Sequence, residues 1–391
     1  MKKRLLTAAM VSVALASCVT DESLTDVGKQ DGEIKFVAAN YVAQTRGGHG
    51  AGAFSNDNFS VYAWEDKSTN TIMDAVRIDK QQVDGSFVTN DGKSYFWPNR
   101  VTLDFTAVSP AANVYSDVER SYTAATNEAP EVESTTITFT FNEDNPNPTN
   151  VNLMYADYVS QTYDYDDPSS NASVALLFRH VLAKLKVVLT QDDPEPHENG
   201  VKSYEVKVKN LTISGIRNEG SLTVNNAYVD AAKGDENTTL WTSPAGNDTW
   251  TIYNNNAGFS LQTNSVDVQT GTLTKTPTNF DSTNNGWENY YVMPQTMVKP
   301  NAQANPVVVG QVLSVTYDVI TEFEEGTIAT RTFTKTVDLK DITAITNWYA
   351  NKFITYTINI QPANLTAITF TATEENWCTD HTGTSGSTDV K

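Results

Sequence analysis

Cysteine and histidine are both scarce in this chain of 391 residues, which contains 2 cysteines and 4 histidines. Because Cys18 and Cys378 stand at opposite ends of the sequence, a disulfide-rich scaffold is excluded. None of the histidines has a second histidine or a paired cysteine at zinc spacing. The sequence also lacks a G-x-S-x-G elbow, a Walker lysine loop and a dinucleotide-binding glycine motif. We therefore expect no enzyme, no catalytic residue, no cofactor and no metal site.

Two features with some potential for chemistry have simpler explanations. The acidic run at Asp164, Asp166 and Asp167 lacks the glycine and the terminal glutamate of an EF-hand calcium loop, so a solvated loop is expected. His180 follows Phe178 closely at a predicted strand, and we expect a hydrogen-bonded structural residue there. Paired carboxylates for glycoside cleavage need not be near in sequence, but no spacing suggests them.

Basic residues are also in the minority, with 27 Lys and Arg against 47 Asp and Glu and a net charge of -20. Such a surface repels nucleic acid, so we expect no nucleic-acid partner. Long helical periodicity is almost absent, whereas Thr, Asn and Val are abundant, which favours β-structure.

The N-terminus carries an apolar run from Leu5 to Ala16 behind Lys2, Lys3 and Arg4, too short to cross a membrane as a helix. It predicts a signal peptide over residues 1–17. The ending L-A-S-C resembles a bacterial lipobox, which predicts acylation of Cys18 and an outer membrane lipoprotein. The acidic pair at positions 21 and 22 resembles a surface-export signal of Bacteroidetes lipoproteins. An ordinary signal peptide with an incidental cysteine is the alternative.

Short segments of alternating apolar and polar residues follow one another along the chain, separated by Asn, Asp, Gly and Pro. They predict strands at residues 33–39, 59–64, 94–97, 101–108, 135–141, 181–189, 204–213, 221–224, 290–292, 312–320, 330–337, 353–360 and 368–373. In the segment 181–189 the odd positions are apolar, and Lys184 and Lys186 face the other way. A short helix is expected within residues 339–349, opened by Asp341. The pattern is typical of an all-β sandwich protein.

Two polar segments with proline and acidic residues, 163–171 and 191–200, could separate domains. We place the boundary at the first, because several predicted strands precede it. The expected domains are then residues 47–170 and 171–391.

Several phrases occur together in a characteristic order: FSVYAW, YFWP, LDFTAVSP, LMYAD, FRHVLAKLKV, VMPQ, NWYANKFITYTINI and ITFTATEENW. In this respect the chain resembles the fimbrillin or Mfa-like family of Bacteroidetes, the subunits of type V pili. The resemblance runs from the lipobox to Trp377. It implies two transthyretin-like β-sandwich domains in tandem.

The resemblance also implies a maturation route. Family precursors travel as lipoproteins, and an arginine-specific protease cuts an N-terminal loop; Arg46 followed by Gly47 fits that position, with a solvated loop arginine as the alternative. Residues 18–46 would then be a lipidated propeptide containing a removable strand, whose apolar face is Ile34, Phe36 and Ala38.

In the family, a donor strand from the C-terminal end of another subunit fills the place of the lost strand, so residues 365–391 are the candidate region. Ile368, Phe370 and Ala372 repeat the I-x-F-x-A spacing of the removable strand. The segment 368–373 could instead belong to the second domain's own sheet.

The leading hypothesis is a structural or accessory subunit of a surface fimbria that serves adhesion. Its partners would be other fimbrial subunits, the Arg-specific protease, the outer membrane through the lipid on Cys18, and a host or bacterial surface ligand. The alternative is a non-polymerising surface lipoprotein that binds glycan or a host ligand with Trp241, Trp250 and Trp287, although tryptophans in such a fold are more often core residues. Cys378 could form a bond between subunits or simply be tolerated.

Overall fold

The protein is almost entirely β in the computed structural model, which describes residues 32–43, 49–82, 84–126, 129, 131–146, 150–167, 169–191, 199–225, 241–261, 290–304, 308–363 and 368–376. Within these residues the helical structure is a single 3₁₀ turn, η2 (Leu339–Asp341). The expectation of an all-β fold is therefore confirmed. None of the helical structure in these ranges is long and apolar enough to span a membrane.

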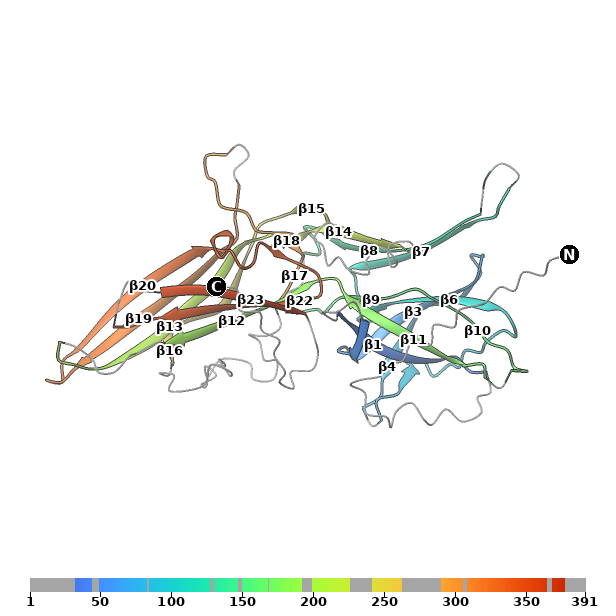
Figure 1. The fold of residues 1–391 in the computed structure, drawn as a ribbon, viewed down its shortest axis with the longest axis horizontal. Helices are drawn as coiled ribbons and strands as arrows, with labels where there is room; N and C mark the ends of the chain where they lie inside the picture. Colours follow the sequence, from blue (N-terminus) through green and yellow to red (C-terminus); the bar gives the residue numbers. More distant parts are fainter. Residues whose placement is uncertain are drawn as a thin grey trace.

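Nine strands from the N-terminal half of the chain form one sheet, shown in blue to green in Figure 1. Its order is β2-β1-β11-β9-β6-β3-β4-β5, with β10 paired to β6. The bounds are β1 (Lys35–Ala43), β2 (His49–Ala53), β3 (Asn58–Glu65), β4 (Thr71–Lys80), β5 (Phe87–Thr89), β6 (Thr102–Ser109), β9 (Met154–Ala156), β10 (Val159–Thr162) and β11 (Ser173–His180). Side chains alternate across a strand, so Phe59, Val61 and Ala63 of β3 enter one core, while Tyr62 and Trp64 face the opposite side.

A four-stranded sheet covers that opposite side, above the nine-stranded sheet in Figure 1. Its order is β15-β14-β8-β7, with bounds β7 (Ser116–Thr123), β8 (Val132–Phe141), β14 (Glu219–Asn225) and β15 (Trp241–Ala245). A separate apolar core joins the two layers, and it includes Val108 and Tyr155 from the larger sheet and Phe139 and Leu222 from the smaller one.

Two further four-stranded sheets enclose the core of the C-terminal half. One has the order β17-β12-β22-β23 and the other β16-β13-β19-β20. The bounds are β12 (Ala183–Gln191), β13 (Val201–Ile216), β16 (Asp248–Leu261), β17 (Tyr290–Val292), β19 (Val312–Phe323), β20 (Ile328–Asp338), β22 (Lys352–Ile360) and β23 (Ile368–Asn376), besides a small pair, β18 (Gln295–Thr296) with β21 (Asn347–Trp348). The odd positions of the predicted strand at 181–189 are buried as expected, those from Ala183 on in this core.

Each half contains one parallel pair made by its first strand. β1 runs parallel to β11, with Phe36 opposite Val174, and β12 runs parallel to β22, with Leu185 opposite Ile354. Because a parallel pair cannot be joined by a hairpin, each partner comes from far along the sequence.

Two sequence expectations need correction. Residues 94–97 are no strand, and Phe96 makes only an isolated bridge to Glu33. Asp341 ends the helical turn instead of opening it, and the helix stops after one turn. The segment 163–171, expected to separate two domains, lies between β10 and β11 of the nine-stranded sheet, and the next strand, β12, belongs to a different sheet.

Candidate functional site

Strand β1 is built into the core of the nine-stranded sheet. Ile34, just before it, and Phe36 are each 6% exposed, and Ala38 packs partly buried against the same core. The ring of Phe36 meets Phe59 and Phe105 edge to face, each with centroids 6.2 Å apart. The three residues predicted to face the core therefore do so, and burying a side chain as large as Phe36 contributes about 1.5–3 kcal/mol.

The backbone of β1 is bonded on both sides. One side pairs with β11 over six residues, from Lys35 opposite Ser173 to Asn40 opposite Phe178. The other side pairs with β2, whose position in the strand order is the edge of the sheet. Removal of β1 would thus leave the β11 edge without a partner and β2 without its neighbour.

The chain connects β1 to the rest of the sheet by a hairpin. Ala43 and His49 are paired at its end, so residues 44–48 form the connection. Arg46 and Gly47, the predicted cleavage position, lie in this connection and outside the described residues.

The chain is held firmly again directly after β2. Phe54 is buried, and the centroid of its ring lies 4.7 Å from the ring centroid of Phe178 and 5.5 Å from that of Phe59. The Asn56 side chain donates to the Ser109 hydroxyl at 2.8 Å and to the Asn152 carbonyl at 2.9 Å. A chain beginning near residue 47 would therefore keep its anchorage to the core.

One residue of β1 is poorly suited to its place. Asn40 is fully buried, and neither its side-chain nitrogen nor its side-chain oxygen has a hydrogen-bond partner in the described structure. An unsatisfied buried amide costs about 1–3 kcal/mol. The strand is consequently less stable in its site than its apolar residues alone would make it.

The candidate donor residues lie elsewhere, in β23 of the C-terminal half. Ile368, Phe370 and Ala372 pack partly buried against the core of the C-terminal sheets, and β23 pairs with β22 alone, at the sheet edge. The alternative that this segment belongs to its own sheet is thus correct for the single chain. The structure does not bring these residues near β1.

The tryptophans proposed for glycan stacking are core residues where they are described. Trp241 is 3% exposed, stacks on Phe141 with centroids 5.0 Å apart and donates its indole N–H to the Val181 carbonyl. Trp250 is 5% exposed. Trp287 lies outside the described residues, as do Cys18 and Cys378.

The acidic run at 164–167 forms a loop, as the sequence indicates. Asp164 and Asp166 form ion pairs with Arg100, at 3.0 and 2.8 Å. Asp167 accepts hydrogen bonds from Ser169.

His180 is fully buried, and its Nδ1 lies 2.8 Å from the Asn152 side-chain oxygen, which confirms a hydrogen-bonded structural residue. Burial, and secondarily the charge of Lys184, lowers the pKa of His180 to about 3. The imidazole is therefore neutral at physiological pH and is no base exposed to substrate.

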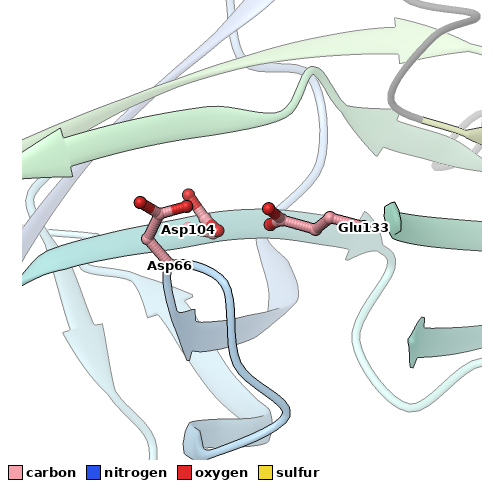
Figure 2. Close-up of side chains that lie close together, drawn as sticks. All are labelled: Asp66, Asp104 and Glu133. Carbon is pink, nitrogen blue, oxygen red and sulfur yellow. The ribbon is translucent and has the colours of Figure 1, made fainter. Parts of the chain in front are cut away.

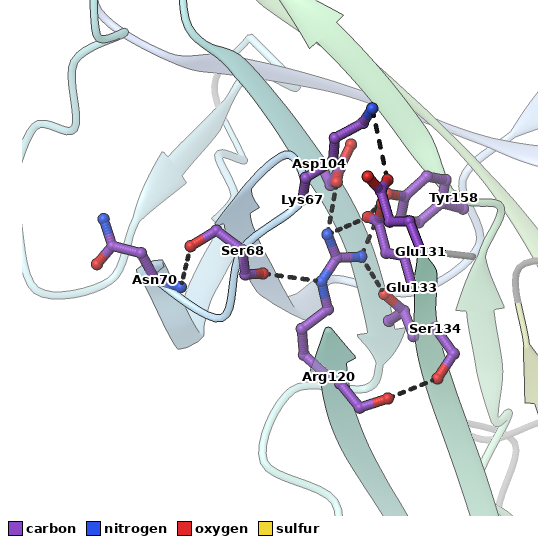
Figure 3. Close-up of polar contacts among 11 residues, drawn as sticks. Lys67, Ser68, Asn70, Asp104, Arg120, Glu131, Glu133, Ser134 and Tyr158 are labelled. Atoms are coloured by element: carbon purple, nitrogen blue, oxygen red, sulfur yellow. Dashed lines mark hydrogen bonds and ion pairs between the residues drawn. The ribbon is translucent and has the colours of Figure 1, made fainter. Parts of the chain in front are cut away.

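A buried ionic network joins the nine-stranded sheet to the sheet that covers it. Figure 3 shows the Arg120 guanidinium of β7 at its centre. One terminal nitrogen donates to Asp104 of β6, at 2.7 Å, and to Glu133 of β8. The other donates to the Thr135 hydroxyl at 2.8 Å and to the Tyr158 hydroxyl at 3.3 Å.

The centre of the network is buried away from solvent. The side chains of Arg120 and Asp104 are 3% and 1% exposed, and the guanidinium lies over the Trp64 ring, 5.6 Å from its centroid. Burial first, and then the neighbouring Asp104 carboxyl, raise the pKa of Glu133 against the opposing effect of Arg120. Burial likewise raises the pKa of Tyr158. The network thus fixes the position of the β7–β8 hairpin on the larger sheet.

Three carboxylates of this region come together. One oxygen from each of Asp66, Asp104 and Glu133 lies within 4.8 Å of the others. Figure 2 shows Asp104 between Asp66, in the turn after β3, and Glu133, which reaches in from β8.

Sequence reasoning missed this constellation, because its members stand far apart in the chain. A signal did exist in the strand LDFTAVS, where Asp104 is the one charged residue. A charge within a buried strand requires a partner.

The chain matches the Fimbrillin-like family over residues 45–377. No curated protein matches it. Among solved structures, it is similar to a candidate cell adhesion protein of Bacteroides uniformis, with 16% identity, a TM-score of 0.39, and coverage of 89% of this chain and 100% of the other. A candidate cell adhesion protein of Bacteroides ovatus has 12% identity and a TM-score of 0.43, with 89% and 98% of the two chains covered. Because the family match extends over most of the sequence, the chain belongs to the fimbrillin-like family.

Proposed function

We propose that this protein is a structural or accessory subunit of a cell-surface fimbria that serves adhesion. Membership of the fimbrillin-like family supports a fimbrial or adhesion role at the cell surface, in a family of structural proteins and not of enzymes. In the finer proposal, the precursor is exported as an outer membrane lipoprotein acylated at Cys18. An Arg-specific protease cuts between Arg46 and Gly47, and the subunits then assemble by strand exchange with other fimbrial subunits.

The observation that carries this proposal is the position of β1. Its apolar side chains complete a core, yet its covalent link to that core is the connection 44–48, which contains Arg46. A single cut there would turn β1 into a separate peptide held by non-covalent contacts alone. Its loss would expose apolar surface around Phe59 and Phe105 and the backbone of β11, and both demand a replacement strand.

Strand β23 is the proposed donor. It is an edge strand with the I-x-F-x-A face of β1, and the threonines between Ile368, Phe370 and Ala372 are exposed. Release of β23 would break pairing with one strand, β22. We propose that it leaves its own sheet and fills the β1 position of the next subunit.

The proposed division into two sandwich domains follows the sheets. We propose a boundary between β11 and β12, at residues 181 and 182, and not at residues 170 and 171. β14 and β15 extend from the second domain to complete the sheet of β7 and β8. This sharing would hold the two domains of one subunit in a fixed relation.

The test is to treat the purified precursor with an Arg-specific protease and to analyse the products by mass spectrometry and SDS gel. We expect a fragment ending at Arg46, followed by SDS-resistant oligomers. The variant Arg46→Gln should release no fragment and stay monomeric. Cleavage elsewhere, or cleavage without oligomers, would count against the proposal.

A second experiment separates the donor from the acceptor. Phe370→Asp should allow cleavage at Arg46 but prevent self-assembly, because a carboxylate cannot enter the apolar β1 position. Mature protein from cells that retains residues 18–46 would instead support a permanent surface lipoprotein.

A further inference from the structure

The carboxylates of Asp66, Asp104 and Glu133 come from three separate elements of the fold. Asp66 follows β3, Asp104 lies in β6 and Glu133 in β8, so the cluster lies where the nine-stranded sheet meets the β7–β8 hairpin. Oxygens within 4.8 Å of one another are no farther apart than the about 5 Å between opposite ligands of a bound calcium ion.

Arg120 neutralises only part of this cluster. Its guanidinium binds Asp104 through Oδ2 and Glu133 through Oε1. No ion pair or side-chain hydrogen bond to the Asp66 carboxylate occurs in the described part of the chain, and the nearby Lys67 pairs with Glu131 at 3.4 Å. Three carboxylates against one guanidinium leave the cluster with excess negative charge.

The second oxygen of Asp104 gives an independent indication of a missing ligand. Asp104 is fully buried, and its Oδ1 has no hydrogen-bond partner in the described structure. Its carboxylate lies between the other two, as Figure 2 shows. An unpaired carboxylate oxygen in a dry layer is costly, and a cation is the group that best satisfies it.

We propose that Asp66, Asp104 and Glu133 bind a calcium ion. The ligand set consists of oxygen alone, which suits hard cations better than zinc and copper, which favour nitrogen and sulfur. Three side chains from three elements give an irregular arrangement, which calcium tolerates better than magnesium does. Asp66 is accessible to solvent, so the ion has an entry path and water completes its coordination.

The ion would act as a clamp between the two layers. Asp104 belongs to the nine-stranded sheet, Asp66 belongs to the turn after β3, and Glu133 belongs to the hairpin. Arg120 already joins the same layers, because one of its nitrogens binds both Asp104 and Glu133. Calcium would therefore tighten the attachment of the hairpin, independently of whether β1 is cut or exchanged.

The experiment uses the full chain and terbium, which replaces calcium in oxygen sites and emits when nearby aromatic rings are excited. Trp64 and Tyr158 both contact the network. We expect sensitised emission that calcium displaces and magnesium displaces poorly. Calcium should also raise the midpoint of thermal unfolding by about 5 °C at saturation.

Asp66→Asn is the decisive variant, because Asp66 makes no side-chain bond to the Arg120 network and its loss should leave the fold intact. It should weaken terbium and calcium binding about tenfold or more and abolish most of the thermal shift. The matched control is Asp164→Asn in the exposed loop beside Arg100, which should bind as the wild type.

Three results would overturn the inference: no displaceable emission in the wild type, unchanged binding in Asp66→Asn, or equal loss in Asp66→Asn and Asp164→Asn. The last would mean that the ions only gather at the acidic surface. In each case the protease test at Arg46 could still succeed, so the two proposals fail separately.

Discussion

Phe36 of β1 and Phe105 of β6 meet edge to face, with ring centroids 6.2 Å apart and planes at 75°. Neither strand is hydrogen-bonded to the other, since β11 and β9 lie between them in the sheet order. The contact therefore spans the concave face of the sheet. The ring of Phe36 thus belongs to the apolar core, besides the backbone pairing of its strand.

Phe36→Ala should lower the free energy of unfolding of the uncut chain by about 3–5 kcal/mol, because it empties a buried ring position. The measurement is urea unfolding followed by tryptophan fluorescence. Lys35→Ala, on the exposed side of the same strand, is the matched control and should change stability by about 0.5 kcal/mol or less. Equal effects of the two variants would show that β1 is not held by its apolar face.

Asn40→Leu should stabilise β1 in its site by about 1–3 kcal/mol, because it replaces a buried amide without partners by an apolar side chain of similar size. After cleavage at Arg46, the variant should release the β1 fragment more slowly and assemble later. Fragment release can be followed by size-exclusion chromatography at intervals. Faster release than in the wild type would contradict this reading of Asn40.

Strands with a clear local pattern were predictable from the sequence. FSVYAW and LDFTAVS became β3 and β6, which are buried on both faces, and the Lys184 and Lys186 pattern located β12, because short apolar or alternating segments leave a readable signal. The apolar face formed by Phe36 and Ala38 of β1, and by Ile34 just before it, was predicted from its alternating pattern.

Partners that depend on long-range topology were not predictable. Nothing in the sequence of β11 indicates that it pairs in parallel with β1. The predicted boundary at residues 170 and 171 even placed β11 in the second domain, away from β1. Likewise, Asp104 finds Arg120 only because β7 folds back over β6. Such contacts are set by the arrangement of sheets, which local pattern does not encode.

Arg120→Met should destabilise the chain by about 3–5 kcal/mol, because it leaves Asp104 as a buried carboxylate without its counter-ion. Arg100→Met is the matched control: its pair with Asp164 is solvent-exposed, and such pairs contribute about 1 kcal/mol or less. Thermal unfolding in a chelating buffer, followed by circular dichroism, measures both. A small effect at position 120 would mean that the hairpin is held by the apolar core alone.

The free energy of unfolding should decrease as the pH is lowered below neutrality, and His180 should cause a measurable part of that decrease. Burial lowers the pKa of His180 to about 3 in the folded chain, whereas the unfolded chain binds this proton near pH 6.5. Between these values the unfolded state holds more protons, so acidification lowers the free energy of unfolding by up to about 1.4 kcal/mol per pH unit, and the full stability is present above pH 6.5.

His180→Gln can keep the hydrogen bond to Asn152 but cannot titrate. Urea unfolding at pH 7 and pH 5 should therefore show a drop in the wild type that is about 2 kcal/mol larger than in the variant. The same drop in both proteins would mean that His180 takes up its proton in the folded state, and that it is less isolated from water than its burial implies.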